Sequence, residues 1–184
     1  MVEIVQVSDF HYGSGFKDEL FDNVVEYLKK NTPDAIICTG DLVHKGRKFQ
    51  FEPLLPYLET LESIAPLMCI PGNHDVKNSG LLFFEHLISP RRSTMIFDDK
   101  DTIIIGACSA KDDLSEGEIG DEQLEWIARQ FHQPLQNRIL ALHHHLIALP
   151  NAGRKLTTVY DAGEILELSR LFEVDVVLMG HRHI

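Results

Sequence analysis

Residues 70–75 read Ile-Pro-Gly-Asn-His-Asp, which places an amide, an imidazole and a carboxylate directly after an apolar run and a Pro-Gly turn. The preceding run, residues 67–70, is short, aliphatic and without polar alternation, which is typical of a strand buried on both faces of a sheet. Pro, Gly, Asn and Asp are ordinary turn residues, but a turn does not require the histidine at position 74. The stretch therefore predicts a strand end that carries side chains able to bind a ligand.

Similar aliphatic runs recur along the chain and alternate with amphipathic segments. We expect strands at residues 2–7, 35–39, 67–70, 103–108, 139–142 and 174–179, and helices at 17–30, 52–61, 121–131 and 162–172. This alternation predicts one α/β domain over residues 1–184, with a layered and largely parallel sheet. The segment 93–108 has two strand-like halves around a turn, so a hairpin and a mixed sheet or two sheets are expected. Asp121 is expected to cap its helix.

The composition narrows the classes of function. Asp and Glu number 28 against 17 Lys and Arg, for a formal net charge of −11, which argues against a broad nucleic-acid footprint or a polybasic membrane patch. No apolar run has the length of a membrane span, and the start of the chain does not resemble a signal peptide. The cysteines, Cys38, Cys69 and Cys108, lie in apolar runs and are interpreted as buried thiols in a reducing compartment. These features predict a cytoplasmic protein.

Polar side chains with ligand chemistry follow five of the expected strands. They are Asp9, His11, Asp41, Asn73, His74, Asp75, the run His143–His145, His181 and His183. The carboxyl ends of parallel strands lie along one edge of a sheet, where open α/β folds build their sites. Seven of the ten histidines fall in these junctions, which turn chemistry alone does not explain.

Histidine and carboxylate side chains together suit Mn, Fe, Zn or Ni. Two ligands at i and i+2 on an extended segment point the same way, so Asp9 and His11 are expected to share a site, as are His181 and His183. Asp41 has two oxygens and could bridge two ions. Two adjoining ions would polarise a phosphoryl group and generate a hydroxide nucleophile near neutral pH.

The ordered motifs D-x-H, GD-x4-G, GNHD, a histidine cluster and G-H-x-H resemble the calcineurin-like metallophosphoesterases, over residues 2–183. The resemblance implies an αββα sandwich of mixed, mostly parallel sheets flanked by helices. The stretch GEIGDEQLEWI, residues 117–127, is similar to the branch that includes class III cyclic-nucleotide phosphodiesterases. The segment YDAG, residues 160–163, is similar to bacterial and archaeal members.

The same resemblance implies a role for each matching residue. The first ion would be held by Asp9, His11, Asp41 and His183, and the second by Asp41, Asn73, His143 and His181. His74 would contact the phosphate and help to protonate the leaving group, and Asp75 would orient His74. A metal-bound hydroxide would attack phosphorus in line, with Mn or Fe favoured as the two divalent ions.

Some positions stay open at this level. Relatives often read H-H-P-P where this chain reads H-H-H, so His143 is favoured as the ligand and His144 as a neighbour of the substrate, although a shift of one residue would exchange them. His145 fits either a place behind the ligands or the surface, and His44 fits either a substrate contact or a solvent-facing loop. The basic pairs at 91–92 and 154–155 are interpreted as solvated charges.

The residues therefore predict a dinuclear metal-dependent enzyme that hydrolyses small phosphate esters, most of all phosphodiesters. A nuclease of the same superfamily is the alternative among enzymes, and a non-catalytic scaffold with this fold is the alternative outside them. Nucleic acid and membrane are not expected as partners. The sequence ends directly after GHRH, where relatives usually continue, so the C-terminal strands of the fold are expected to be missing.

Overall fold

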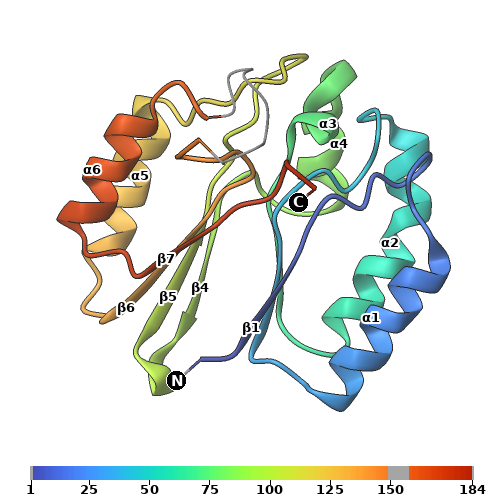
Figure 1. Ribbon diagram of the computed structural model, residues 1–184, viewed down its shortest axis with the longest axis horizontal. Helices are drawn as coiled ribbons and strands as arrows, with labels where there is room; N and C mark the ends of the chain where they lie inside the picture. Colours follow the sequence, from blue (N-terminus) through green and yellow to red (C-terminus); the bar gives the residue numbers. More distant parts are fainter. Residues whose placement is uncertain (1, 149–157, 184) are drawn as a thin grey trace.

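The computed structural model describes residues 2–148 and 158–183 and shows two facing sheets with helices on both outer sides (Figure 1). The order of elements is β1 (Ile4–Val7), α1 (Asp18–Lys30), β2 (Ala35–Cys38), α2 (Lys48–Glu62), β3 (Leu67–Cys69), α3 (Asn73–Val76), η1 (Lys77–Ser79), α4 (Gly80–Leu87), β4 (Ser93–Phe97), η2 (Asp98–Lys100), β5 (Thr102–Gly106), α5 (Asp121–Phe131), β6 (Asn137–Ala141), α6 (Ala162–Leu171) and β7 (Val176–Leu178). The predicted αββα layering is confirmed.

The first sheet has the order β1-β2-β3, and both of its strand pairs are parallel. Its outer face packs on α1, α2 and α4, through buried side chains such as Leu28, Leu54 and Phe84. Strand β2 is buried along its whole length, as the aliphatic run of residues 35–38 predicts.

The second sheet has the order β4-β5-β6-β7. Strands β4 and β5 form the predicted antiparallel hairpin, and the other pairs are parallel, so this sheet is mixed. Helices α5 and α6 cover its outer face through Ile127, Phe131 and Ile165.

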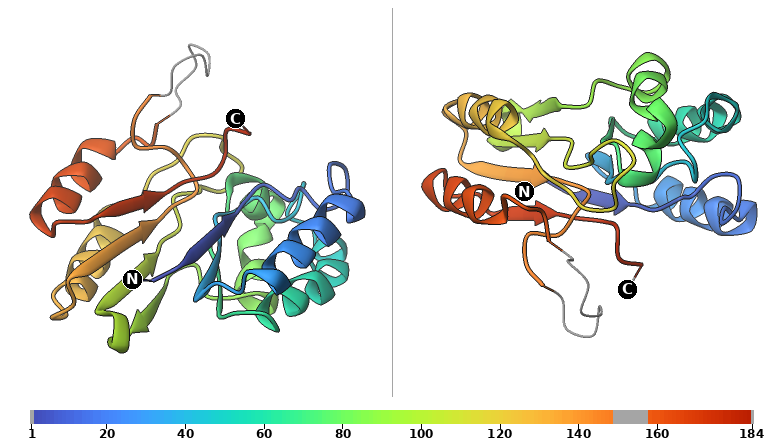
Figure 2. Two further views of the ribbon diagram at one scale, coloured as in Figure 1. Left: turned by 60° about the horizontal axis from the view of Figure 1, so that its bottom comes forward. Right: turned by 90° about the horizontal axis from the view of Figure 1, so that it is seen from above.

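A separate apolar cluster joins the inner faces of the two sheets and includes Ile37, Met68, Ile104 and Ile139. This packing aligns the sheets, so the loops that follow their parallel strands open at the same end of the molecule (Figure 2). The fold thereby brings together five loops that are far apart in the sequence.

The structure departs from the sequence interpretation at three elements. Helix α2 begins at Lys48 and not at residue 52, and its two prolines lie on the exposed face, where water can satisfy the carbonyls they leave unbonded. The sequence interpretation placed His86 in a helical pattern but gave no bounds for helix α4, whose sequence GLLFFEHL is largely apolar. Gly120, not Asp121, is the N-cap residue of α5.

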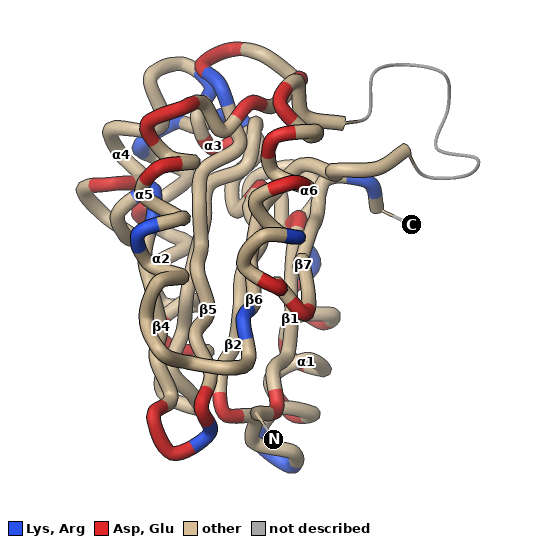
Figure 3. Tube along the Cα trace, turned by 90° about the vertical axis from the view of Figure 1, so that its left-hand side faces the viewer, with Lys and Arg blue, Asp and Glu red and all other residues tan. Residues whose placement is uncertain are grey.

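In the view of Figure 3, the Lys and Arg positions are scattered along the chain trace among Asp and Glu positions. Within residues 2–148 and 158–183, none of the helices combines the length and the apolar character that a bilayer crossing needs.

Candidate metal centre

The loops after β1, β2, β3, β6 and β7 converge at one end of the sandwich and are joined by backbone hydrogen bonds. The N–H of Asp9 donates to the carbonyl of Gly40 at 3.0 Å, and the N–H of His11 donates to the carbonyl of Asp41 at 2.9 Å. On the other sheet, the N–H of Gly180 donates to the carbonyl of His143 at 2.9 Å. These bonds hold the ligand-bearing segments together in pairs.

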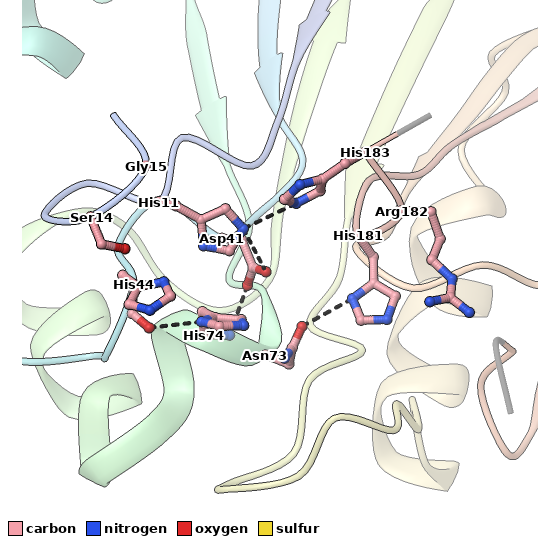
Figure 4. Close-up of a pocket in the computed structure, with 10 residues that line it drawn as sticks. All are labelled: His11, Ser14, Gly15, Asp41, His44, Asn73, His74, His181, Arg182 and His183. Atoms are coloured by element: carbon pink, nitrogen blue, oxygen red, sulfur yellow. Dashed lines mark hydrogen bonds and ion pairs between the residues drawn. The ribbon is translucent and has the colours of Figure 1, made fainter. Parts of the chain in front are cut away.

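A first group of donor atoms comes from Asp9, His11, Asp41 and His183, of which Figure 4 draws the last three. Nε2 of His183 lies 3.1 Å from Nε2 of His11 and 3.1 Å from Oδ1 of Asp9. Nε2 of His11 lies 3.7 Å from Oδ2 of Asp41 and 4.0 Å from Oδ1 of Asp9. This is the set that the resemblance implied for the first ion.

A second group gathers Asp41, Asn73, His143 and His181. Oδ1 of Asn73 lies 3.1 Å from Nε2 of His143 and 3.0 Å from Nδ1 of His181. Nε2 of His143 lies 3.5 Å from Oδ2 of Asp41. The same oxygen of Asp41 therefore faces both groups.

The donor atoms fit divalent metal ions. Ligands about 2.1 Å from one ion are separated by about 3.0 Å at a right angle and about 3.4 Å at a tetrahedral angle, close to the separations in both groups. Nδ1 of His143 donates to the carbonyl of Thr39 at 2.7 Å, so the lone pair of a neutral ring is on Nε2, toward Asn73 and Asp41. The seven predicted ligands are thus brought together, and nitrogen with carboxylate donors suits Mn, Fe, Zn or Ni.

The backbone reaches this arrangement by a different route from the one expected. Asp9, His11, Asp41, His181 and His183 have φ values of 58, 47, 53, 73 and 38°. These are left-handed conformations, so the prediction that ligands at i and i+2 converge along extended segments is wrong. Such conformations are unfavourable for residues other than glycine and are held by the surrounding contacts, commonly at functional sites.

Two glycines allow the close approach of the loops around Asp41. A Cβ on Gly72 would overlap the backbone nitrogen and the carboxylate of Asp41. A Cβ on Gly40, which has a φ of 90°, would lie 2.7 Å from both the backbone nitrogen of Gly72 and Nδ1 of His143. Both positions therefore require glycine.

His74 lies beside the two groups in a cavity of about 470 Å³ (Figure 4). Its backbone N–H donates to Oδ1 of Asp41 at 2.7 Å. Nδ1 of its ring donates to the carbonyl of His44 at 2.7 Å, which leaves Nε2 to accept from Nζ of Lys77 at 3.2 Å. His44 also lines the cavity, and its place within the GD-x4-G motif was the sequence feature that marked it as a candidate site residue. Lys77 was not identified as a site residue from the sequence.

Asp75 makes different contacts from those expected. Its carboxylate is fully buried and accepts from the N–H groups of Leu42, Val43 and Gly72, at 3.1, 2.8 and 2.8 Å. The ring of His74 instead donates from Nδ1 to the carbonyl of His44. Asp75 thus braces the loop after β2 against the loop after β3, and its catalytic role stays a prediction.

The histidine run separates into three environments. His143 belongs to the second group, whereas His144 is 2% exposed and has Oγ of Ser109 2.9 Å from its Nδ1. His145 is also buried, which places it behind the ligands and not on the surface. His144 is not among the residues that line the cavity of Figure 4, and its substrate contact stays a prediction.

The protonation of the site follows from burial and neighbouring charge. Burial alone would raise the pKa of Asp41, but the hydrogen bond and charge of His143 outweigh it and hold the pKa well below its usual range. Burial, reinforced by the charge of His143, lowers the pKa of His181 to about 4. Burial would lower the pKa of His143, but the hydrogen bond and charge of Asp41 outweigh it and raise that pKa. At neutral pH Asp41 is ionised and the His181 ring is neutral, which are forms that bind metal, whereas His143 would bind a metal through Nε2 only after releasing the proton from that atom.

The basic pairs lie elsewhere. Arg91 pairs with Glu85, and Arg92 pairs with Glu122 and lies 5.3 Å from the ring centre of Trp126, in a different cavity. The pair at positions 154 and 155 lies outside the described residues.

Comparison with known proteins decides the family. The family model of calcineurin-like phosphoesterases matches residues 2–184. The chain belongs to this family. The geometry of the two donor groups is suited to the metal-dependent phosphoester chemistry of this family.

Curated relatives carry phosphodiesterase names. The chain is 25% identical over 195 residues to the 3',5'-cyclic adenosine monophosphate phosphodiesterase CpdA of Escherichia coli (strain K12), covering 99% of this chain and 70% of that protein. It is 27% identical over 197 residues to the glycerophosphodiester phosphodiesterase GpdQ of Enterobacter lignolyticus, covering 98% and 70%. It is 28% identical over 159 residues to a probable cyclic nucleotide phosphodiesterase of Rhodococcus erythropolis, covering 82% of this chain and 52% of that protein. The chain thus spans about half of the last relative.

Solved structures support the fold. The chain superposes on purple acid phosphatase PPD1 from yellow lupin with a TM-score of 0.73 at 17% identity, covering 98% of this chain and 37% of that one. It superposes on a dimetal phosphatase from Danio rerio with a TM-score of 0.68 at 13% identity, covering 99% and 82%.

Proposed function

We propose that this calcineurin-like phosphoesterase is a phosphodiesterase that uses two divalent metal ions, with Mn and Fe favoured over Zn and Ni. The observation that carries the proposal is the position of Oδ2 of Asp41, 3.7 Å from Nε2 of His11 and 3.5 Å from Nε2 of His143. One carboxylate oxygen thus faces both donor groups, which suits a carboxylate that bridges two ions through a single oxygen.

Asp9, His11, Asp41 and His183 would hold one ion, and Asp41, Asn73, His143 and His181 the other. Bound there, the ions would supply Lewis-acid polarisation of the phosphoryl oxygens and a lowered pKa for the attacking water. The chain itself positions these ligands through the fixed tautomer of His143 and through Gly40 and Gly72.

His74 is placed to manage the proton of the leaving group. Its Nδ1 is committed to the carbonyl of His44, so Nε2 is the nitrogen that can exchange a proton with a bound substrate. The adjacent ammonium of Lys77, 3.2 Å from Nε2, adds positive charge on this side of the cavity, which suits an anionic ester.

The proposed substrate is a small phosphodiester. A cavity of about 470 Å³ is of the size that accommodates small molecules, and the relatives are named for cyclic nucleotides and glycerophosphodiesters. The formal net charge of −11 disfavours the nuclease alternative, and the full set of ligands disfavours the scaffold alternative. A cytoplasmic location stays a prediction, consistent with three buried free thiols.

The test compares hydrolysis of bis-p-nitrophenyl phosphate and p-nitrophenyl phosphate, with and without Mn²⁺. We expect Mn²⁺-dependent hydrolysis that favours the diester and is abolished in Asp41→Asn. Asp34→Asn, at an ion pair with Lys100 near the opposite end of the strands, is the matched control and should keep wild-type activity. Equal activity in Asp41→Asn and wild type would refute the proposal.

A further inference from the structure

One polar cluster behind the metal ligands has no role in the chemistry described above. Ser109, in the loop after β5, is fully buried, and His144 is 2% exposed. Neither residue lines the cavity of Figure 4, yet both lie beside the ligand histidines.

The hydrogen bonds of Ser109 fix the direction of every proton in this cluster. Its Oγ accepts from the backbone N–H of His143 at 3.3 Å and of His144 at 3.1 Å, which uses both lone pairs of the hydroxyl. The hydroxyl proton must then go to the remaining neighbour, Nδ1 of His144, at 2.9 Å. Nδ1 is therefore an acceptor, and Nε2 carries the hydrogen and donates to the carbonyl of Ser115 at 3.2 Å.

Both ring nitrogens of His144 are thus occupied by protein groups, and the ring has a single orientation. In that orientation its centre lies 4.9 Å from the ring of His143 and 4.6 Å from the ring of His181. The cluster is tightly enclosed, since a Cβ on Gly117 would lie 2.6 Å from both Nδ1 of His144 and the carbonyl oxygen of Ser109. The His144 ring therefore supports two predicted ligands of the same ion.

We propose that Ser109 and His144 form a lock that positions His143 and His181 for the second metal ion, and that His144 does not contact substrate. This inference rests on the metal-dependent function proposed above. The Ser109 hydroxyl holds the backbone of His143 and His144 in place. The ring of His144 packs against the rings of His143 and His181, and the carbonyl of Ser115 accepts the last hydrogen bond. Such residues behind the ligands commonly change metal affinity by about 10- to 100-fold when they are replaced.

The test measures Mn²⁺ binding by isothermal titration calorimetry, together with KM and kcat for bis-p-nitrophenyl phosphate at saturating Mn²⁺. Ser109→Ala and His144→Phe should each weaken binding at one Mn²⁺ site by about 10- to 100-fold. KM at saturating Mn²⁺ should stay within about twofold, because the substrate side of the cavity is unchanged. The double variant should lose little more than either single variant, since the two residues act as one unit.

Two further variants distinguish a specific loss of Mn²⁺ binding from a general loss of folding. Ser89→Ala removes a partly buried hydroxyl that donates to the carbonyl of Cys69 at 2.9 Å and should bind Mn²⁺ like wild type. Ser109→Cys fills nearly the same volume with a weak donor and should also weaken Mn²⁺ binding, even where the alanine variant fails to fold.

Three results separate the possibilities. Wild-type Mn²⁺ affinity in Ser109→Ala and His144→Phe would overturn the lock. A raised KM in His144→Phe with unchanged Mn²⁺ affinity would also overturn it and would make His144 a substrate contact. Absence of Mn²⁺ binding by the wild-type chain would instead refute the function on which the lock depends.

Discussion

Replacing Asp75 by asparagine tests whether this residue braces two loops or orients His74. The change preserves shape but converts one carboxylate oxygen into an NH₂ group, which cannot accept a hydrogen bond. In the wild-type chain, Oδ2 accepts from two backbone N–H groups, those of Leu42 and Gly72, and Oδ1 accepts from that of Val43. In the better of its two orientations, the asparagine places its oxygen at the Oδ2 position and keeps the bonds from Leu42 and Gly72. Its NH₂ group then takes the Oδ1 position and faces the N–H of Val43, which loses its acceptor.

The magnitude follows from this geometry. A buried N–H left without an acceptor costs about 1–3 kcal/mol. Burial and the charge of Asp41 raise the pKa of Asp75 to about 7, so the ionised carboxylate is itself disfavoured, and its removal offsets the weakening of the two retained bonds. We expect the free energy of unfolding to fall by about 1–3 kcal/mol, a sizeable part of the ~5–15 kcal/mol typical of a domain. The melting temperature should fall by roughly 2–12 °C.

The assay is urea unfolding of the metal-free chain at pH 7.5, followed by circular dichroism. Asp161→Asn is the matched control. The N–H of Ile119 lies 3.0 Å from both Oδ1 and Oδ2 of Asp161, and the N–H of Gly120 donates to Oδ2, so one asparagine oxygen at the Oδ2 position can accept from both N–H groups. That variant should stay within about 1 kcal/mol of wild type.

The catalytic readout separates the two roles of Asp75. Because the ring of His74 is held by the carbonyl of His44, the pH dependence of kcat at saturating Mn²⁺ should be unchanged in Asp75→Asn. Wild-type stability combined with a large fall in kcat and a shifted pH profile would refute the loop-bracing argument and restore the orienting role.

Three further predictions concern the donor groups and the cavity. Gly72→Ala should lower kcat/KM for bis-p-nitrophenyl phosphate by about 100-fold, because its Cβ would displace Asp41. A Cβ at Gly163 would meet nothing within 4 Å, so Gly163→Ala should have little effect, and equal activities of the two variants would contradict the argument. His181 has a folded-state pKa of about 4, below its unfolded value, so its contribution to stability is full above about pH 6.5 and is lost as the pH falls toward 4. The melting temperature of the metal-free chain should therefore fall less steeply between pH 6.5 and 4 in His181→Asn than in the wild type. Parallel curves of melting temperature against pH would contradict this. Lys77→Met removes the ammonium beside His74 and should raise KM for anionic diesters by about 10-fold, measured at low salt, whereas an unchanged KM would exclude that contact with substrate.

Local sequence patterns predicted most of the strands and helices, and the family resemblance implied their layering. Strands such as β2 and β5 are buried on both faces, so their aliphatic runs are visible without knowledge of their partners. The ligand positions follow these runs directly, and the order of the motifs identified the family. The bounds of helix α4 were not predicted, because a largely apolar stretch such as GLLFFEHL does not by itself distinguish a helix from a buried strand.

The sequence by itself determined which residue types stand at the strand ends, and so the kind of chemistry available to the chain. Only the tertiary structure decided which atoms meet: that the left-handed backbone of Asp9 and His11 aims their side chains, that Asp75 braces loops, and that Ser109 locks His144. The reason is physical. Residue type is a local property, whereas these contacts join residues some 30 to 170 positions apart, and their geometry depends on how two sheets pack against each other.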